Sequence, residues 1–498
     1  MESTGVKGVN TVDNHGRRER LTSTGRMRIG LCLSLGLFIL TGCQTASRYE
    51  RPELDMPDVW QDAEAVQPLD DREESLQAWW AQFADPDLSA LIDRALSDSL
   101  TLQTAALRIE EATALRGVAA GDRLLAVNGT GAAQAARLSD AEGGALRDSR
   151  SVESYRVGLD ASWELDLWGR IRQSVRAADA AVGVAVEEYR DALVILAGEV
   201  ARQYFVVREL QQRLVFLNAN IQAQKESLHM TQGRYDNGLA PALDVHQAEL
   251  NLTSSQAALA PLRGQLALAF NRLAVLTGQP PGAIVLPARE QWEETVPDFG
   301  LTAGVPADLL NQRPDVRRAE QQLMAQTARL GVARTDLLPR ISLSGTFALQ
   351  AEEVSDLGSS GSLSYRFGPT FFWPLFQGGR IRSNIDAVES RAEQAILQYR
   401  QVVFIALEDV ENAWVSYQLE RDRYVLLQRS VAAAERSVEQ VHTLYENGLV
   451  PFLNVLDAER SLVQQHDQLA QSRGQIYRGL VQVHRALGRG WAQEPVEE

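Results

Sequence analysis

The chain has 498 residues and carries 49 Lys and Arg against 65 Asp and Glu, a formal net charge of −16. This acidic balance argues against nucleic acid as a partner, because neutralising phosphates requires an excess of Lys and Arg. The two cysteines, Cys32 and Cys43, lie near the N-terminus, so the rest of the chain can hold neither a disulfide framework nor a cysteine-ligated metal. No apolar run reaches the ~18 residues of a transmembrane helix, whereas membrane β-strands leave a weaker, alternating signal.

The first 42 residues have the pattern of a secretory signal peptide. An apolar run from Ile29 to Leu40 follows several arginines and leads into Thr41-Gly42-Cys43. This ending resembles a bacterial lipobox, in which the cysteine is lipidated and becomes the first mature residue. The next residue is Gln44 rather than Asp, which by the same resemblance favours the outer membrane. We therefore predict lipidation at Cys43, with either Met1 or Met27 as the start of translation.

One large unit is written twice in the chain. Residues 235–249 and 445–459 are identical at nine of fifteen positions at an offset of 210. The same offset aligns Gly-Arg-Ile-Arg at 169–172 with 379–382, and further matches spread over more than a hundred residues in one register. This is a duplicated large unit rather than a short-period solenoid. The predicted organisation is a signal peptide at 1–42, a linker at 43–86, repeats at 87–278 and 306–488, a connector at 279–305 and a tail at 489–498.

Each repeat opens with a predicted helix followed by two predicted strands. The helices are expected at 87–120 and 306–335, the second starting with Pro306, which suits a first helical turn. Apolar and polar residues then alternate over 155–166 and 341–350, the pattern of strands with one apolar face. The partner strand near Leu125 is less clear. Alternation over ~10 residues with aromatic ends is typical of a membrane β-barrel, although strands of a soluble sandwich alternate equally well.

A very long helix comes next in each repeat. The segments 169–235 and 379–445 contain no proline, and apolar residues recur every ~3.5 positions in the first, which is the coiled-coil period. At ~1.5 Å per residue such a helix spans roughly 100 Å. No compact globular core is that deep, so the helix must form a rod or part of a tube.

Short Asn-Gly turns end both long helices and lead into returning helices. Glycine accepts the left-handed conformation that follows a helix, and the prolines suit the start of the next helix. This local chemistry explains the motif, so any function must come from where the hairpin sits. The hairpin residues are Asn237, Gly238, Pro241, Asn447, Gly448 and Pro451.

These motifs together resemble a known family. Residues 79–88, Trp-Trp-Ala-Gln-Phe-Ala-Asp-Pro-Asp-Leu, look like the opening of TolC-like outer-membrane efflux lipoproteins of the NodT and OprM type. Residues 162–170, the run 313–316 and both hairpins match the same family, and the resemblance covers essentially all of the mature chain. One departure is Leu124-Leu125, where the family often has a proline before its first strand.

The resemblance implies a homotrimer that is mainly α-helical, with a membrane β-barrel. Four strands per chain would make a twelve-stranded barrel in the outer membrane, and four helical segments per chain would make an α-barrel across the periplasm. The implied function is a passive exit duct of a tripartite efflux system for drugs or other small molecules. Its partners would be a periplasmic adaptor (membrane fusion) protein and an inner-membrane pump of the RND, MFS or ABC type. Four strands also leave open edges, which lipid does not tolerate, so oligomerisation is expected on physical grounds.

Two other functions are compatible with parts of the sequence, whereas the motifs of the common enzyme classes are missing from it. Within the family, the chain could instead be the exit duct of a type I protein-secretion system. Outside the family, the alternative is a periplasmic coiled-coil scaffold or adhesin. None of the six histidines lies in an HExxH or nucleophile motif, and the adjacent carboxylates Glu110 and Glu111 diverge on a helix. We expect neither an enzyme, nor a metal, nor a cofactor.

The resemblance also assigns a gate. In the family the two hairpins close the periplasmic end of the tube, and acidic side chains there line its constriction. By position, Tyr445, Asn454 and Asp457 in the second hairpin and Asp244 in the first carry these contacts. Asp244 and Asn454 also suit the capping of a first helical turn. Asp457 lies one turn further on, and its repeat equivalent is Gln247, so the duplication alone does not require an acid there. Family members with Asp at the position of Asn454 would carry more charge in this ring.

Overall fold

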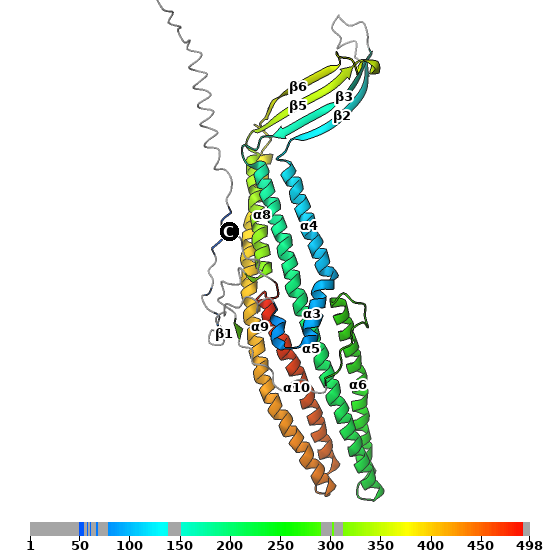
Figure 1. Ribbon diagram of the computed structural model, residues 1–498. Helices are drawn as coiled ribbons and strands as arrows, with labels where there is room; N and C mark the ends of the chain where they lie inside the picture. Colours follow the sequence, from blue (N-terminus) through cyan, green and yellow to red (C-terminus); the bar gives the residue numbers. More distant parts are fainter. Residues whose placement is uncertain are drawn as a thin grey trace, which may run out of the picture.

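The computed structural model describes residues 49–53, 57, 60, 66–67, 78–137, 151–289, 301–302 and 312–491. The molecule is elongated, with one β-sheet at one end and two helical hairpins at the other (Figure 1). The predicted signal peptide, the lipidation site at Cys43, the predicted helix start at Pro306 and the tail beyond Trp491 lie outside the described residues. Within the described part, no helix combines the length and the apolar character needed to cross a membrane.

The same series of elements occurs twice. Helices α4, α5 and α6 have 22, 67 and 35 residues, and their counterparts α8, α9 and α10 have the same lengths. The first unit contains α3 (Pro86–Asp98), α4 (Leu100–Gly121), β2 (Ala126–Arg137), β3 (Ser151–Glu164), α5 (Arg170–Asp236) and α6 (Ala242–Leu276). The second contains α8 (Pro314–Thr335), β5 (Arg340–Ala351), β6 (Leu363–Phe372), α9 (Arg380–Glu446) and α10 (Phe452–Ala486). Shorter elements are β1 (Val66–Gln67), η3 (Trp79–Phe83), β4 (Leu301–Thr302) and η5 (Val354–Asp356).

The first helix of each repeat differs from its prediction. The single helix expected at 87–120 is broken at Ser99, whose backbone is extended (φ −64°, ψ 121°), so α3 and α4 are separate helices. The prediction of one continuous helix over 306–335 is also wrong, because Arg313 is extended (φ −82°, ψ 120°) and α8 begins at Pro314. A residue before a proline is pushed away from the helical conformation by the proline ring, which explains the second break.

Packing at each break explains why both are kept. Gly278 and Gly488 follow the returning helices α6 and α10 and both have a φ of +70°. A Cβ on Gly278 would lie 2.6 Å from the carbonyl oxygen of Asp98, and one on Gly488 would lie 2.9 Å from Cα of Arg313. Each returning helix therefore ends against the break, at the last residue of α3 in the first repeat and at the extended Arg313 in the second, in a contact that only glycine permits.

The four long strands form one antiparallel sheet in the order β2-β3-β5-β6. Pairing places Leu159 opposite Phe347 and Phe347 opposite Tyr365, so apolar side chains share one exposed face. On the other face Asp160 accepts hydrogen bonds from Thr130 (2.9 Å) and Thr346 (2.8 Å). The sheet is thus apolar on one side and polar on the other, and strands β2 and β6 form its two open edges.

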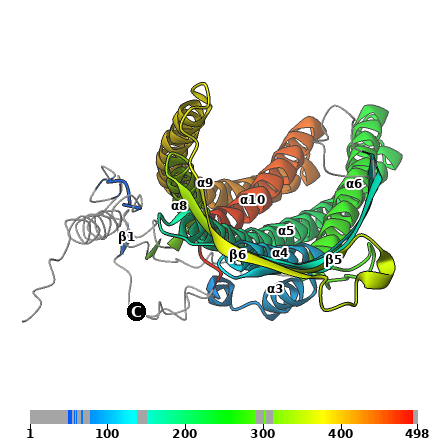
Figure 2. The same ribbon diagram turned by 90° about the horizontal axis from the view of Figure 1, so that it is seen from above.

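The helices form a curved row beneath the sheet. Helices α9, α10, α5 and α6 follow one another along this row when seen from above (Figure 2). Higher up, α4 packs against α5, and α8 fills the space between α5 and α9. The largest buried cluster lies midway, where Trp79, Tyr204 and Leu273 bring η3, α5 and α6 together with α3 and α10. The two hairpins, α5–α6 and α9–α10, therefore extend side by side from this packed middle section, away from the sheet (Figure 1).

Candidate functional site at the hairpin ends

The two hairpin turns have the same geometry. Gly238 and Gly448 adopt φ values of +69° and +72°, the left-handed conformation that glycine accepts most easily. The side-chain amides of Asn237 and Asn447 each donate a 2.7 Å hydrogen bond to a carbonyl four residues earlier, on Gly233 and Thr443. Pro241 and Pro451 then stand immediately before α6 and α10 as the N-cap residues. These contacts satisfy backbone carbonyls at the helix ends, so the turns are locally self-sufficient.

Tyr445 ties the two hairpins together at this end. Its side chain is buried, with 3% exposed, and its ring lies 5.2 Å from that of Phe452. Its hydroxyl donates a long hydrogen bond of 3.4 Å to Oδ2 of Asp244 on the other hairpin. From that hairpin Arg234 also places its guanidinium 4.8 Å over the Tyr445 ring and donates to the carbonyl of Glu446 at 2.7 Å. The structure therefore brings Asp244 and Tyr445 together across the hairpins.

The environment of Tyr445 favours its protonated form. Burial raises the pKa of its hydroxyl, and the neighbouring Asp244 carboxylate raises it further, against the opposing influence of Thr231 and Arg234. The neutral hydroxyl can therefore donate to Asp244 at physiological pH. No side-chain capping bond is found at the start of α6, and the Asp244 carboxylate instead accepts its hydrogen bond from Tyr445.

Asn454 and Asp457 occupy a different face of α10. Both side chains are exposed, whereas Phe452, Val455 and Leu456 point into the packing between helices. The structure of one chain thus does not bring Asn454 or Asp457 to the Asp244–Tyr445 pair. Their exposed positions leave them available to face another molecule or an open lumen.

A second polar contact between the hairpins was not predicted from the sequence. Glu459 is buried and accepts hydrogen bonds from Asn251 on α6 (3.1 Å) and from His442 on α9 (3.1 Å). Arg460 donates to the side-chain oxygen of Asn251 at 3.2 Å. One sequence signal was available, since Glu459 follows the apolar Phe452, Val455 and Leu456 at helical spacing and so had to face the core. Its partners come from distant positions and carry no such signal.

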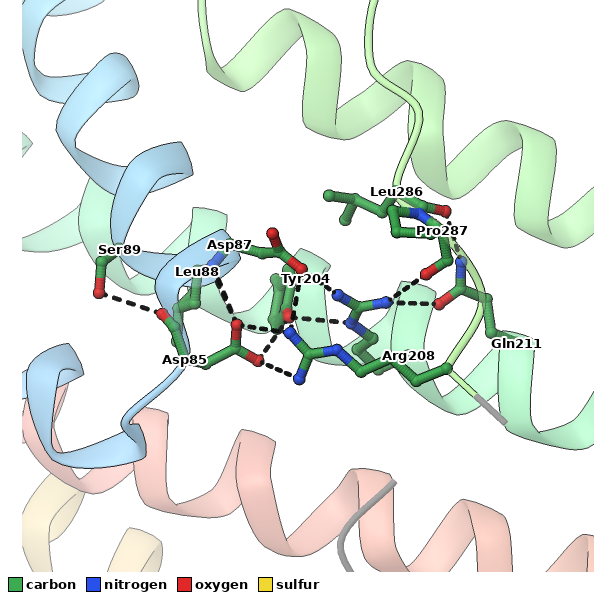
Figure 3. A network of polar contacts seen from close by, with 10 residues as sticks. Asp85, Asp87, Leu88, Ser89, Tyr204, Arg208, Gln211, Leu286 and Pro287 are labelled. Carbon is green, nitrogen blue, oxygen red and sulfur yellow. Dashed lines mark hydrogen bonds and ion pairs between the residues drawn. The ribbon is translucent and has the colours of Figure 1, made fainter. Parts of the chain in front are cut away.

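A polar network holds the middle section from which the hairpins hang (Figure 3). Asp85 caps α3 through the backbone N–H of Asp87 (3.1 Å), and it accepts hydrogen bonds from Tyr204 (2.6 Å) and from both Nη atoms of Arg289 (3.0 Å each). Burial alone would raise the pKa of Asp85, but the hydrogen bonds from Tyr204 and Arg289 outweigh it and keep that pKa below its ordinary value. The carboxylate is therefore ionised when the network is intact.

Arg208 extends this network to the connector between the repeats. It donates to the Tyr204 hydroxyl (2.8 Å), to the carbonyl of Pro287 (2.8 Å) and to Oδ2 of Asp87 (2.7 Å). The run 79–88 was noted in the sequence only as a family motif, and neither Arg208 nor Arg289 was singled out. Nothing in a single sequence indicates that these distant arginines converge on Asp85 and Asp87.

The contacts described so far hold helices together and do not form a metal site. Among the residues that the structure describes, no group of three or more His, Cys, Asp or Glu side chains is placed to hold a metal. His466 stacks on Phe216 with ring centroids 4.7 Å apart, and His484 stacks on Trp79 at 5.0 Å, both as packing partners within the helix row. The hairpin contacts link two rods that could separate without breaking either one.

Comparison with known proteins decides the family. The sequence model of the outer membrane efflux protein family matches residues 91–279 and 305–489. The chain belongs to this family. It is 30% identical over 466 residues to the cation efflux system protein CusC of Escherichia coli O6:H1, a match that covers 93% of this chain and 98% of CusC. It is 28% identical to nodulation protein T of Rhizobium leguminosarum bv. trifolii over 91% of this chain and 96% of that protein.

Solved structures agree with the family assignment. The outer-membrane channel OprN shares 35% sequence identity and superposes with a TM-score of 0.81, covering 89% of this chain and 99% of OprN. The predicted resemblance to TolC-like efflux channels is therefore confirmed, and with it the fold class in which a helical tube wall continues into barrel strands. The function of the chain is that of the outer-membrane channel of a tripartite efflux system. The family is one of transport components rather than of enzymes.

Proposed function

We propose that three copies of this chain close into one passive duct that crosses the outer membrane and the periplasm. The observation that carries this proposal is the sheet with two open edges, β2 and β6, and an exposed apolar face. Unpaired backbone N–H and C=O groups cost several kcal/mol each in a lipid environment, so the edges must pair. Pairing β6 of one copy with β2 of the next would close a twelve-stranded barrel with its apolar face toward lipid.

The helix row supports the same closure. On α9, at one edge of the row, Leu397, Phe404 and Leu419 are 64%, 57% and 64% exposed. On α4 and α6, at the other edge, Leu107 and Leu268 are 62% and 70% exposed. Side-by-side packing of neighbouring copies would bury both edges and continue the curved row into a tube.

The proposed duct carries small molecules received from partners. Relatives are named as cation and solvent efflux proteins, which favours an efflux duct over a protein-secretion duct. A passive channel has no energy source of its own, so an inner-membrane pump of the RND, MFS or ABC type would drive transport and a periplasmic adaptor would join pump to duct. Enzymatic activity forms no part of this role.

The hairpin ends would form the periplasmic gate of this duct. Asp244 and Tyr445 supply the closing contact within each copy, and Asn454 and Asp457 project from the exposed face of α10. Three Asp457 carboxylates that converge on a threefold axis would attract cations and repel anions within a Debye length of ~8 Å. Opening would require the two hairpins of each copy to part at Tyr445.

Arginine substitution on the two faces of the sheet tests the membrane placement. Leu343→Arg and Phe367→Arg should each cost about 2–4 kcal/mol in lipid near the midplane and reduce the heat-modifiable trimer in outer-membrane fractions. Ser342→Arg and Ser344→Arg, on the polar face of β5 beside Leu343, should be milder. Equal losses of trimer from substitutions on the two faces would show that the sheet does not lie in the membrane.

Lipidation is proposed at Cys43, from the lipobox pattern. Metabolic labelling with an acyl-chain probe should mark the wild-type protein and leave Cys43→Ser unmarked. Because the barrel strands would hold the membrane by themselves, the variant should keep part of its efflux activity. If the wild-type protein takes up no label, the proposed lipidation at Cys43 is wrong.

A further inference from the structure

A cavity of about 520 Å³ lies between the two hairpins and is lined by α5, α6 and α10. Its lower end is at Arg460, eight residues into α10, and its upper end is at Gln265 on α6. At 1.5 Å per residue these positions lie about 12 Å and about 35 Å from the hairpin ends. The volume is within the range of small-molecule sites in proteins.

One wall of the cavity is apolar. Phe216 and Leu217 from α5, Leu262 from α6 and Val463 from α10 line it. Pro261 lies inside the continuous helix α6 next to Leu262, and its missing N–H removes one helical hydrogen bond there. Its repeat equivalent on α10 is Gln471, so the duplication does not account for this proline. An apolar body of aromatic size fits such a wall.

Gln224 supplies an unpaired polar group to the same cavity. The residue lines the cavity and is 4% exposed, yet its Oε1 has no hydrogen-bond partner among the residues that the structure describes. An unsatisfied buried acceptor costs ~1–3 kcal/mol, so such groups are rare in native structures and call for an explanation. Because this oxygen is itself buried, the side-chain amide has to turn toward the cavity before a hydroxyl or amine of a ligand can donate to it.

Three charged residues line the cavity, and one of them, an arginine, has no carboxylate partner there. Arg213 is neutralised by Asp467, with Nε and Oδ1 2.6 Å apart. Arg460 is exposed, and within the described part of the chain its guanidinium has one hydrogen bond, from Nε to Oδ1 of Asn251 at 3.2 Å. The adjacent Glu459 is already engaged by Asn251 and His442. The two Nη groups of Arg460 are therefore available to an anion, and an arginine fork matches a carboxylate well.

We propose that this cavity is a binding site for an amphipathic organic acid. The apolar body of the ligand packs against Val463, which lies between the heights of Arg460 and Gln224 and below Phe216 and Leu262. Its carboxylate binds Arg460, and a hydroxyl or amine at its other end donates to Gln224. Because α5 and α6 belong to one hairpin and α10 to the other, the bound acid contacts both hairpins of one chain. The site lies within a single chain, so it stands independently of the proposed trimer.

The test measures binding of 6-hydroxy-2-naphthoate to the full chain in lipid nanodiscs by titration calorimetry, with empty nanodiscs as the blank. Two related probes each lack one feature: 2-naphthol lacks the carboxylate and 6-methoxy-2-naphthoate lacks the donor. The site requires that both bind more weakly than the parent probe. Arg460→Gln should weaken the parent probe about tenfold, the value of one hydrogen bond to a charged group. Arg436→Gln, an exposed arginine on α9 outside the cavity, should leave its affinity unchanged.

A second readout locates the bound probe. Ser255 lines the cavity, and the only cysteine predicted to remain in the mature chain is the lipidated Cys43. In Ser255→Cys, saturating probe should slow maleimide labelling, and in Ser255→Cys combined with Arg460→Gln this protection should be lost. Unprotected labelling at saturating probe, equal affinity for 2-naphthol, or an Arg460→Gln affinity equal to wild type would each overturn the proposal.

Discussion

The two hairpins share one backbone plan but occupy different surroundings. Helices α5 and α9 have 67 residues each, and their Asn-Gly turns have nearly the same dihedral angles. Helix α5 lies inside the row between α6, α8 and α10, whereas α9 is at its edge. Duplication therefore preserved the lengths and the turns, and position in the row determined what the side chains contact.

One pair of equivalent positions shows the consequence. Glu187 on α5 is 3% exposed and forms ion pairs with Arg190 (2.8 Å) and Arg317 (2.9 Å). Its equivalent on α9, at the offset of 210, is Leu397, which is 64% exposed. The inner copy satisfies a buried charge within the chain, while the outer copy presents apolar surface that a neighbouring chain would cover. This contrast shows that equivalent helix positions serve different ends in the two repeats, a contact within the chain on α5 and an exposed apolar surface at the edge of the row on α9.

The largest expected difference between the copies concerns Arg208, whose equivalent is Gln418. The Arg208 side chain is 2% exposed and pairs with Asp87. Breaking a fully buried pair costs about 3–5 kcal/mol, but Asp87 is 36% exposed and keeps Arg289, so we expect about 2 kcal/mol for Arg208→Ala. Gln418→Ala should change stability by less than about 0.5 kcal/mol. Thermal unfolding followed by helical circular dichroism measures both effects. Similar losses of stability in the two variants would contradict the claim that Arg208 contributes more to stability than Gln418.

The turns provide a case in which the copies should behave alike. Gly238→Ala and Gly448→Ala each force a side chain into the left-handed region, at a cost of about 1 kcal/mol. Chemical denaturation of the two variants should therefore give nearly equal losses of unfolding free energy. A clearly larger loss at one turn would show that its surroundings, and not its local backbone, determine its stability.

The gate distinguishes the copies by charge. Asp457 has Gln247 as its equivalent, so Asp457→Asn should reduce the cation preference of the duct by about twofold, whereas Gln247→Ala should leave it unchanged. Asp457→Ala combined with Tyr445→Phe should also loosen closure and raise the open fraction. Single-trimer conductance in a planar bilayer reports ion preference and open fraction together. If neither changes, Asp457 is an ordinary surface carboxylate.

The smallest expected effect separates Tyr445 from its equivalent, Tyr235, which is 44% exposed. Burial and Asp244 raise the pKa of Tyr445 above its ordinary value of 10.0. The stabilisation from the neutral hydroxyl is thus fully present below pH 10 and is lost as the pH rises through the raised pKa. The difference in tyrosinate absorbance between wild type and Tyr445→Phe should have a midpoint above that of free tyrosine. A midpoint at or below 10 would place Tyr445 in water rather than between the hairpins.

The sequence predicted the long helices and their turns well because both signals are local. Apolar spacing near that of a coiled coil, the absence of proline and the Asn-Gly dipeptide set α5 and α9 to within one or two residues of their observed ends. The repeat offset then indicated that the second half would follow the first. Strand alternation also indicated which face of the sheet is apolar.

Other features depend on contacts between distant residues. The break at Ser99 has no proline to mark it and is retained with Gly278 packed against the preceding Asp98. The break before Pro314 was available from the backbone restriction that proline imposes on Arg313, and it was missed. At the candidate gate, the positions of Asp244 and Tyr445 came from family resemblance. The contacts of Glu459 with Asn251 and His442 arise only when α6, α9 and α10 are packed.

The number of chains in the intact complex tests the central claim most directly. Native mass spectrometry of the protein extracted from outer membranes in mild detergent would count the chains and weigh each one. The account predicts a single species of three chains, each beginning at a lipid-modified Cys43. A species of one or two chains would contradict it, because neither number can pair every β2 edge with a β6 edge in a closed barrel of twelve strands.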